Sequence, residues 1–265
     1  LVLIPAVVFF GGSVDFATLG NTGLAGQTIA EVYEANGASA IWSNVIKYVG
    51  AGAIATGGVI SLLKSLPLII KTFAGAMKSL KNTSGGTNVR TDRDLKMPVV
   101  LGIILIVIIL IWLVPSVPVS LLGAFLIAIF GFFFATVSSR MVGLIGSSNN
   151  PVSGMAIATL LISTFVLKAT GNTGMAGMTG AIAIGSIICV IAAIAGDTSQ
   201  DLKTGFIVGA TPAKQQVGEL IGVVASGFAI AGVMSLLNKA WGFGSAEIPA
   251  PQATLMKMIV EGIMD

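Results

Sequence analysis

Long runs of apolar residues, separated by short polar segments, dominate the chain. The clearest run extends from Pro98 to Val114 without a charged residue, and another extends from Val119 to Thr136. Further runs lie at 1–10, 42–70, 152–167, 178–195 and 217–237. A helix needs about 20 residues to cross a hydrocarbon layer of about 30 Å. The pattern therefore predicts about seven membrane spans, of which the first is represented only by its end.

The two clearest runs are joined by Pro115-Ser116-Val117-Pro118. Each proline sets its own backbone angle and disfavours helix at the residue before it. We therefore expect a tight turn here and a helical hairpin on either side of it.

Composition supports lipid as the solvent for these runs. Of the 265 residues, 55% are hydrophobic and 9% are charged, against about 25% charged residues in an average soluble domain. We expect an all-α, polytopic transmembrane helix bundle. Residues 1–265 are expected to form a single transmembrane domain, a fragment of a longer membrane protein, because the chain starts with Leu1 inside an apolar run.

The positions of the charges predict an orientation. Seven basic residues follow the run at 42–70 or lie at its end, and short loops rich in Lys and Arg stay in the cytoplasm: Lys64, Lys71, Lys78, Lys81, Arg90, Arg93 and Lys96. Residues 78–96 are thus predicted to be a cytoplasmic basic loop. The charges between residues 11 and 39 are all acidic, which places that segment outside. We expect a multi-pass protein of the cell (inner) membrane.

Several function classes are disfavoured. The chain has no histidine and a single cysteine, Cys189, inside an apolar run, so zinc, haem and histidine-based catalysis lack their usual groups. Lysines flank apolar spans instead of forming a basic face with aromatics, which argues against nucleic-acid binding. We expect no cofactor, no metal site and no enzymatic activity. A membrane-embedded redox subunit is kept as the alternative from another class.

A short repeat punctuates the chain. Gly20-Asn21-Thr22-Gly23-Leu24-Ala25-Gly26 recurs as Gly171-Asn172-Thr173-Gly174-Met175-Ala176-Gly177, each copy after an apolar run and on the predicted outer side. Two such copies suggest internal duplication, as in many transporters. Two interpretations explain the polar residues of the repeat equally well, a glycine-rich outer turn or part of a substrate path: Asn21, Thr22, Asn172 and Thr173.

The connection Gly146-Ser147-Ser148-Asn149-Asn150-Pro151-Val152-Ser153-Gly154 is rich in hydroxyl and amide groups. A turn followed by a helix cap explains two or three of these residues. A broken or re-entrant helix lining a cavity would use all of them. We favour a substrate path that includes these residues: Ser147, Ser148, Asn149, Asn150, Pro151, Ser153 and Gly154.

Two acidic residues near apolar runs are candidates for proton coupling. Glu219 lies three residues after Gln216, at the start of the run at 217–237. A carboxylate there is costly unless it is paired, protonated or in a wet cavity, and desolvation favours its neutral form. An interfacial residue near a helix N-terminus is an equal alternative. Asp197 directly follows the run at 178–195 and could face the same cavity.

Three stretches together resemble the oligopeptide-transporter family, in particular its bacterial branch near the yellow-stripe-like metal-chelate transporters. They are Lys47–Ala53 through Lys64-Ser65-Leu66-Pro67, Gly146–Gly154, and Asp201–Gly205 through Lys214-Gln215-Gln216. The segment Pro249–Met256 looks similar as well. Two features depart from the fungal and plant peptide branch: Asn150-Pro151-Val152 stands where Asn-Pro-Gly is favoured, and no Lys-Ile-Pro-Pro-Arg motif is present.

The resemblance implies a secondary active transporter that imports oligopeptides or peptide-like compounds together with protons, by alternating access. Its partners would be a small peptide or a peptide-like metal chelate, protons and the lipid bilayer. Transport of metal-siderophore or metal-chelate complexes is the alternative within the class. A homo-oligomer is left open.

Overall fold

The computed structural model describes most of the chain, and the statements below concern those residues. Outside the description are positions 1, 20, 51, 54, 55, 58, 59, 61, 62, 65, 68, 69, 72, 73, 75–88, 148, 149 and 265, and the side chain of residue 22. The chain divides into two compact units, Leu1–Thr56 and Gly57–Asp265. Each unit is described by itself.

Among the described residues, the first unit includes the helices α1 (Leu3–Gly11) and α2 (Ile29–Ile41), and α2 leads into a π-helical turn, Trp42–Ile46. Short 3-10 turns at Phe16–Leu19 and Thr22–Leu24 connect the two helices. Its core consists of buried side chains from the first 3-10 turn, α2 and the π-helical turn, namely Phe16, Ile29, Val32, Ile41 and Ile46, and partly buried residues of α1 pack against it. Gly37, with φ +72°, interrupts the helical geometry of α2.

A capping box starts α2. The Thr28 hydroxyl accepts a hydrogen bond from the backbone N–H of Glu31, and the Glu31 carboxylate accepts one from the backbone N–H of Thr28. This reciprocal pair satisfies two N–H groups that a helix start leaves free. The Thr28 backbone N–H, together with its side chain, holds the pKa of Glu31 below its usual range.

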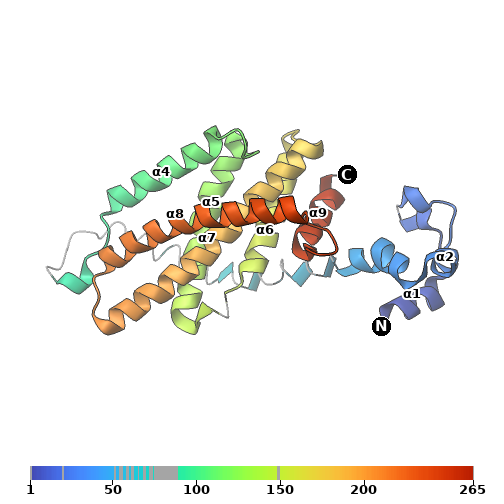
Figure 1. The fold of residues 1–265 in the computed structure, drawn as a ribbon, viewed down its shortest axis with the longest axis horizontal. Helices are drawn as coiled ribbons and strands as arrows, with labels where there is room; N and C mark the ends of the chain where they lie inside the picture. The colour runs from blue at the N-terminus through green and yellow to red at the C-terminus, as the bar shows by residue number, and fades with distance from the viewer. Residues whose placement is uncertain are drawn as a thin grey trace. The chain divides into compact units, whose positions relative to one another are not determined.

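The second unit is a helix bundle built around one long helix (Figure 1). Its helices are α4 (Met97–Leu113), α5 (Leu121–Ile145), α6 (Val152–Ala169), α7 (Gly174–Val208), α8 (Pro212–Ala240) and α9 (Pro251–Met264). Helix α7 packs mainly against α5 and α6, and it also contacts α8 and α9. Helix α4 contacts α5, and α9 contacts α6.

Small residues allow α7 to approach its neighbours closely. A Cβ on Gly131 of α5 would lie 3.1 Å from Ile191 Cδ1, and one on Gly185 of α7 would lie 3.0 Å from Leu160 Cδ1. Lipid provides no hydrophobic drive for helices to associate, so close backbone packing of this kind replaces it. The buried hydroxyls of α6 are bonded to carbonyls of their own helix, as in Thr159 to Met155 and Thr164 to Leu160.

Five of the predicted membrane spans form continuous helices in the structure. Among the described residues, five are long and apolar enough to cross a membrane: α4 with the turn before it (Arg90–Leu113), α5, α6, α7 and α8. Most side chains of α4 and α8 are exposed, and neither helix has a buried residue. The predicted turn at Pro115–Pro118 separates α4 from α5. The first predicted run forms the nine-residue α1. Ten positions of the run at 42–70, and residues 78–88 of the basic loop, lie outside the described residues.

The predicted boundaries were too narrow for two helices. Helix α5 continues beyond Thr136 to Ile145, and α7 runs for 35 residues from Gly174 to Val208. At 1.5 Å per residue α7 is about 52 Å long, well beyond the hydrocarbon thickness. The polar segment after Asp197 is part of this helix as far as Val208. Gly209, with φ +72°, ends α7 in the left-handed conformation that glycine adopts without strain.

The two copies of the Asn-Thr-Gly repeat have different local structures. In the first copy, Asn21 Oδ1 accepts a hydrogen bond from Gly23 N (3.1 Å), which caps a 3-10 turn. In the second copy, Gly171 and Gly174 have positive φ, and α7 begins at Gly174. The shared sequence therefore encodes a turn in both units, but not the same turn.

Candidate polar sites along helix 7

The turn between α5 and α6 brings Asn150 against the middle of α7. Asn150 Nδ2 donates to the carbonyl of Ala192 (3.3 Å), and the Ser138 hydroxyl donates to the same carbonyl. Asn150 Oδ1 is buried and has no partner among the described residues. Such an orphan acceptor is costly unless a water or a ligand pairs with it.

The other predicted path residues of this turn are placed differently. Ser147 and Ser153 are exposed, whereas Pro151 and Gly154 are partly buried. Ser148 and Asn149 lie outside the described residues. Gly146, with φ +105°, ends α5, and α6 begins at Val152 as a regular helix. The described residues thus form a short turn here, and Asn150 is the member that contacts α7.

The charged segment before α4 is hydrogen-bonded to the turn between α7 and α8. Arg90 donates to Thr211 Oγ1 (2.9 Å) and to the carbonyl of Gly209 (2.8 Å). The carbonyl of Arg93 accepts from Ala213 N (2.8 Å), one of the free N–H groups at the start of α8. We call residues 90–95 the docking segment.

Gln216 links the docking segment to a cavity. Its Oε1 accepts from Leu95 N (2.9 Å), and its Nε2 donates to Asp94 Oδ1 (3.2 Å). Both Asp94 and Gln216 line a cavity of about 460 Å³ between α4, α7 and α8. The apolar part of the lining comes from all three helices: Met97, Val100, Ile103, Ile104, Ile194, Leu220 and Val223.

Glu219 is a carboxyl group in this cavity, and it is partly buried. The Thr198 side chain of α7 interacts with it, and both residues line the cavity. Glu219 Oε1 is buried and has no hydrogen-bond partner among the described residues. Asp197, the other predicted acidic residue, is exposed and is not among the lining residues. The structure therefore separates the two candidates.

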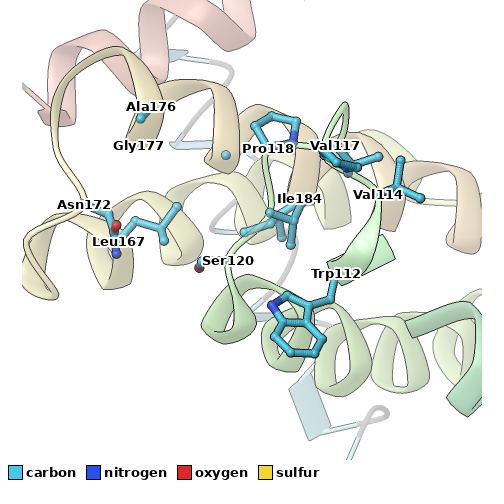
Figure 2. Close-up of a pocket in the computed structure, with 13 residues that line it drawn as sticks. Trp112, Val114, Val117, Pro118, Ser120, Leu167, Asn172, Ala176, Gly177 and Ile184 are labelled. Carbon is cyan, nitrogen blue, oxygen red and sulfur yellow. The ribbon is translucent and has the colours of Figure 1, made fainter. Parts of the chain in front are cut away.

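The opposite end of α7 carries Asn172. Its Nδ2 donates to Thr170 Oγ1 (3.3 Å), and it lines a pocket of about 360 Å³. Trp112 of α4 and Ile184 of α7 line the same pocket (Figure 2). The neighbouring Thr173 is exposed and makes no side-chain cap for α7.

Asn21 belongs to the first unit. Its Nδ2 donates to Asn44 Oδ1 (3.1 Å), and Asn44 lies in the π-helical turn. Such turns occur often at functional sites. Of Thr22 only the backbone is described, in the 3-10 turn Thr22–Leu24.

Polar positions in the second unit follow one another along the axis of α7. The Asn172 pocket lies at Gly177, Asn150 contacts Ala192, and the Glu219 cavity lies at Thr198. At 1.5 Å per residue, these points are about 22 Å and then about 9 Å apart along the helix. Asn172 and Asn150 are thus brought to one helix but not to one site.

Some contributors were not recognised as candidates from the sequence, notably Asp94, Thr198 and Trp112. No local motif marks them, because they are ordinary residues that a distant helix brings to the cavities. Gln216 could have been predicted from the sequence, because it lies about one helical turn before the candidate Glu219 and therefore on the same face of a helix. Among the described residues no group of three or more His, Cys, Asp or Glu side chains could hold a metal ion.

Long apolar helices, small residues at their contacts and cavities with isolated polar groups define a multi-pass membrane protein. The chain belongs to the OPT oligopeptide transporter family, whose model matches residues 1–265.

Two relatives give the same assignment. A candidate oligopeptide transporter of Haemophilus influenzae is 31% identical over 98% of this chain, and the chain covers 46% of that protein. A candidate oligopeptide transporter of Saccharomyces cerevisiae, YGL114W, is 29% identical over 52% of this chain and 19% of its own length. The chain thus spans less than half the length of these relatives. No solved structure matches it.

Proposed function

We propose that this chain forms part of a secondary active transporter of the cell (inner) membrane, which imports oligopeptides together with protons. The family and the names of both relatives support the peptide substrate. Proton coupling is inferred from Glu219. This residue is a carboxyl group with one unpaired oxygen, and it lines a cavity between α4, α7 and α8. Ionisable groups inside membrane helices commonly mark ion or proton pathways.

The substrate path is proposed to include Asn150 and Asn172, with the hydroxyl and amide groups beside them in the sequence. Each side chain reaches the region of α7 from a turn at one end of α6. Asn21, Thr22 and Thr173 stay within this proposal as path residues. Polar side chains at such turns can exchange hydrogen bonds with the peptide groups of a substrate without a strong charge that would hold it.

Uptake into liposomes tests this proposal. Full-length protein is expected to accumulate a labelled tripeptide under an inward proton gradient, and Glu219→Gln is expected to abolish accumulation, because an amide cannot take up or release the proton. Exchange of labelled peptide across the membrane without a gradient should continue in the variant. A metal chelate that is accumulated in place of peptide would identify the alternative substrate class and contradict the peptide assignment.

Two matched variants control for the loss of a carboxylate. Glu247→Gln removes an exposed carboxylate between α8 and α9, and Asp197→Asn removes the exposed one at the edge of the apolar part of α7. We expect both to retain proton-driven uptake. If Asp197→Asn abolishes it and Glu219→Gln does not, the proton is carried at Asp197. If the unmodified protein takes up peptide equally with and without the proton gradient, the proposal of proton coupling is wrong.

A further inference from the structure

The pocket of Figure 2 is a hollow that two inter-helix turns form against α7. A Cβ on Gly180 would lie 3.0 Å from the carbonyl oxygen of Pro118, in the turn between α4 and α5. A Cβ on Gly177 would lie 2.1 Å from the carbonyl oxygen of Asn172, in the turn between α6 and α7. Glycine at both positions therefore allows both turns to lie directly on the helix.

The walls of the pocket are mainly apolar. They include the indole of Trp112, the turn residues Val117 and Pro118, and the side chains of Leu167 and Ile184. The volume of about 360 Å³ is at the small end of the range for ligand sites, about 300–1,000 Å³. It suits one large apolar side chain with the backbone next to it.

A few polar groups stand at the edge of these walls. The exposed Asn172 donates from Nδ2 to Thr170 Oγ1, which leaves its Oδ1 open to a ligand. Figure 2 shows Asn172 to the left of Ile184 and Trp112 below it. An amide oxygen accepts and an indole N–H donates a hydrogen bond, and a peptide backbone offers the complementary N–H and carbonyl groups.

We propose that this pocket binds an apolar side chain of a peptide, while Asn172 and Trp112 pair with the adjacent peptide groups. This inference rests on the proposed function for the peptide substrate, and it adds a preference for side chains of a given kind. The pocket is separate from the Glu219 cavity, because Ile184 and Thr198 lie about 21 Å apart along α7 at 1.5 Å per residue. Selectivity and proton binding are thus assigned to different ends of one helix.

A peptide fits these features better than a lipid chain does. The pocket lies between the two turns at the ends of the helices, and its edge carries a free acceptor in Asn172. A lipid tail has no group that can hydrogen-bond to this amide, whereas a peptide backbone offers both an N–H and a carbonyl.

Fluorescence of Trp112 tests the pocket directly, because the indole is part of its wall. All other tryptophans of the full-length protein, Trp42 and Trp241 among them, are replaced by phenylalanine. Ala-Leu-Ala and Ala-Ala-Ala are then titrated against the detergent-solubilised protein. We expect Ala-Leu-Ala to change the emission and to bind at least tenfold more tightly, since missing methylenes in an apolar pocket cost about tenfold or more.

Three variants locate the preference. Ala176→Leu adds a side chain at an exposed lining position and is expected to remove the preference for Ala-Leu-Ala. Ala169→Leu adds the same side chain at an exposed position of α6 that does not line the pocket, and it should leave the preference unchanged. Asn172→Leu is expected to lower the binding affinity for both peptides about fivefold, the usual effect of one lost hydrogen bond.

Equal affinity for the two peptides, or a preference that survives Ala176→Leu, would overturn this inference. Quenching of Trp112 by brominated phospholipid that peptide does not relieve would overturn it too, because the occupant would be a lipid chain. Proton-driven uptake is measured separately on the same protein. If uptake persists without the leucine preference, the pocket assignment fails alone; if peptides bind here but are not accumulated, the proposed function fails alone.

Discussion

At the scale of single residues, Gly196 decides whether the α5–α6 turn can dock on α7. A Cβ at this position would lie 2.7 Å from Asn150 Nδ2, 2.9 Å from Val142 Cγ2 and 3.1 Å from the Ser138 hydroxyl oxygen. The two hydrogen bonds to the carbonyl of Ala192 therefore depend on a missing side chain one helical turn away.

Gly196→Ala is expected to destabilise the protein by about 1–3 kcal/mol, the usual cost of forcing extra atoms into a packed interior. Thermal unfolding of the detergent-solubilised protein measures the change. Gly218→Ala in α8 is the matched control, because nothing lies within 4 Å of its added methyl group, and alanine favours helix over glycine. An equal loss of stability in both variants would contradict the packing role of Gly196.

At the scale of elements, the junction of α7 and α8 is closely fitted. A Cβ on Gly205 would lie 2.0 Å from Gln215 Oε1, and Gln215 Nε2 donates to the carbonyl of Asp201 (3.2 Å). The docking segment then covers this junction through Arg90, Arg93 and Leu95. Its hydrogen bonds join parts of the chain about 120 residues apart, as in the Arg90–Gly209 pair.

Arg90→Gln is expected to loosen the docking segment, because the guanidinium group makes two of its hydrogen bonds. These contacts are exposed, so we expect a loss of about 1 kcal/mol, which raises hydrogen exchange of the Leu95 amide about fivefold. Mass spectrometry of peptides covering 89–97 measures the exchange. Arg93→Gln is the control, since Arg93 contributes its backbone carbonyl. Unchanged exchange in Arg90→Gln would show that the backbone contacts alone hold the segment.

At the scale of the second unit, the turns at the two ends of α6 should face opposite sides of the membrane. Helix α6 has 18 residues, about 27 Å at 1.5 Å per residue, which matches the hydrocarbon thickness. The distribution of basic residues predicts that the α5–α6 turn is cytoplasmic and that the α6–α7 turn is outside.

Single-cysteine labelling tests this orientation in intact cells. In a background where Cys189 and any other cysteine of the full-length protein are replaced by serine, Thr173→Cys is expected to react with a membrane-impermeant maleimide. Ser147→Cys should react only after the cells are opened. Both original residues are exposed, so access depends on the side of the membrane. Reaction of both from outside, or the reverse order, would refute the predicted topology.

The apolar pattern was sufficient to predict the helices α4 to α8 and the Pro115–Pro118 turn, because lipid requires long apolar runs and proline acts on its own backbone. The ends of α7 could not be predicted. Charged residues such as Asp201 and Lys203 suit both a loop and a helix that extends beyond the bilayer, and hydropathy does not distinguish the two.

The sequence by itself determined the membrane class, the family resemblance and the chemical types of the candidate groups, since these depend on composition and local order. Only the tertiary structure decided which groups share a site. It placed Glu219 in a cavity with Asp94 and left Asp197 exposed, although both acids border apolar runs. The physical reason is that a cavity is made by distant helices whose packing depends on glycines at their contacts, and hydropathy does not encode which helices meet.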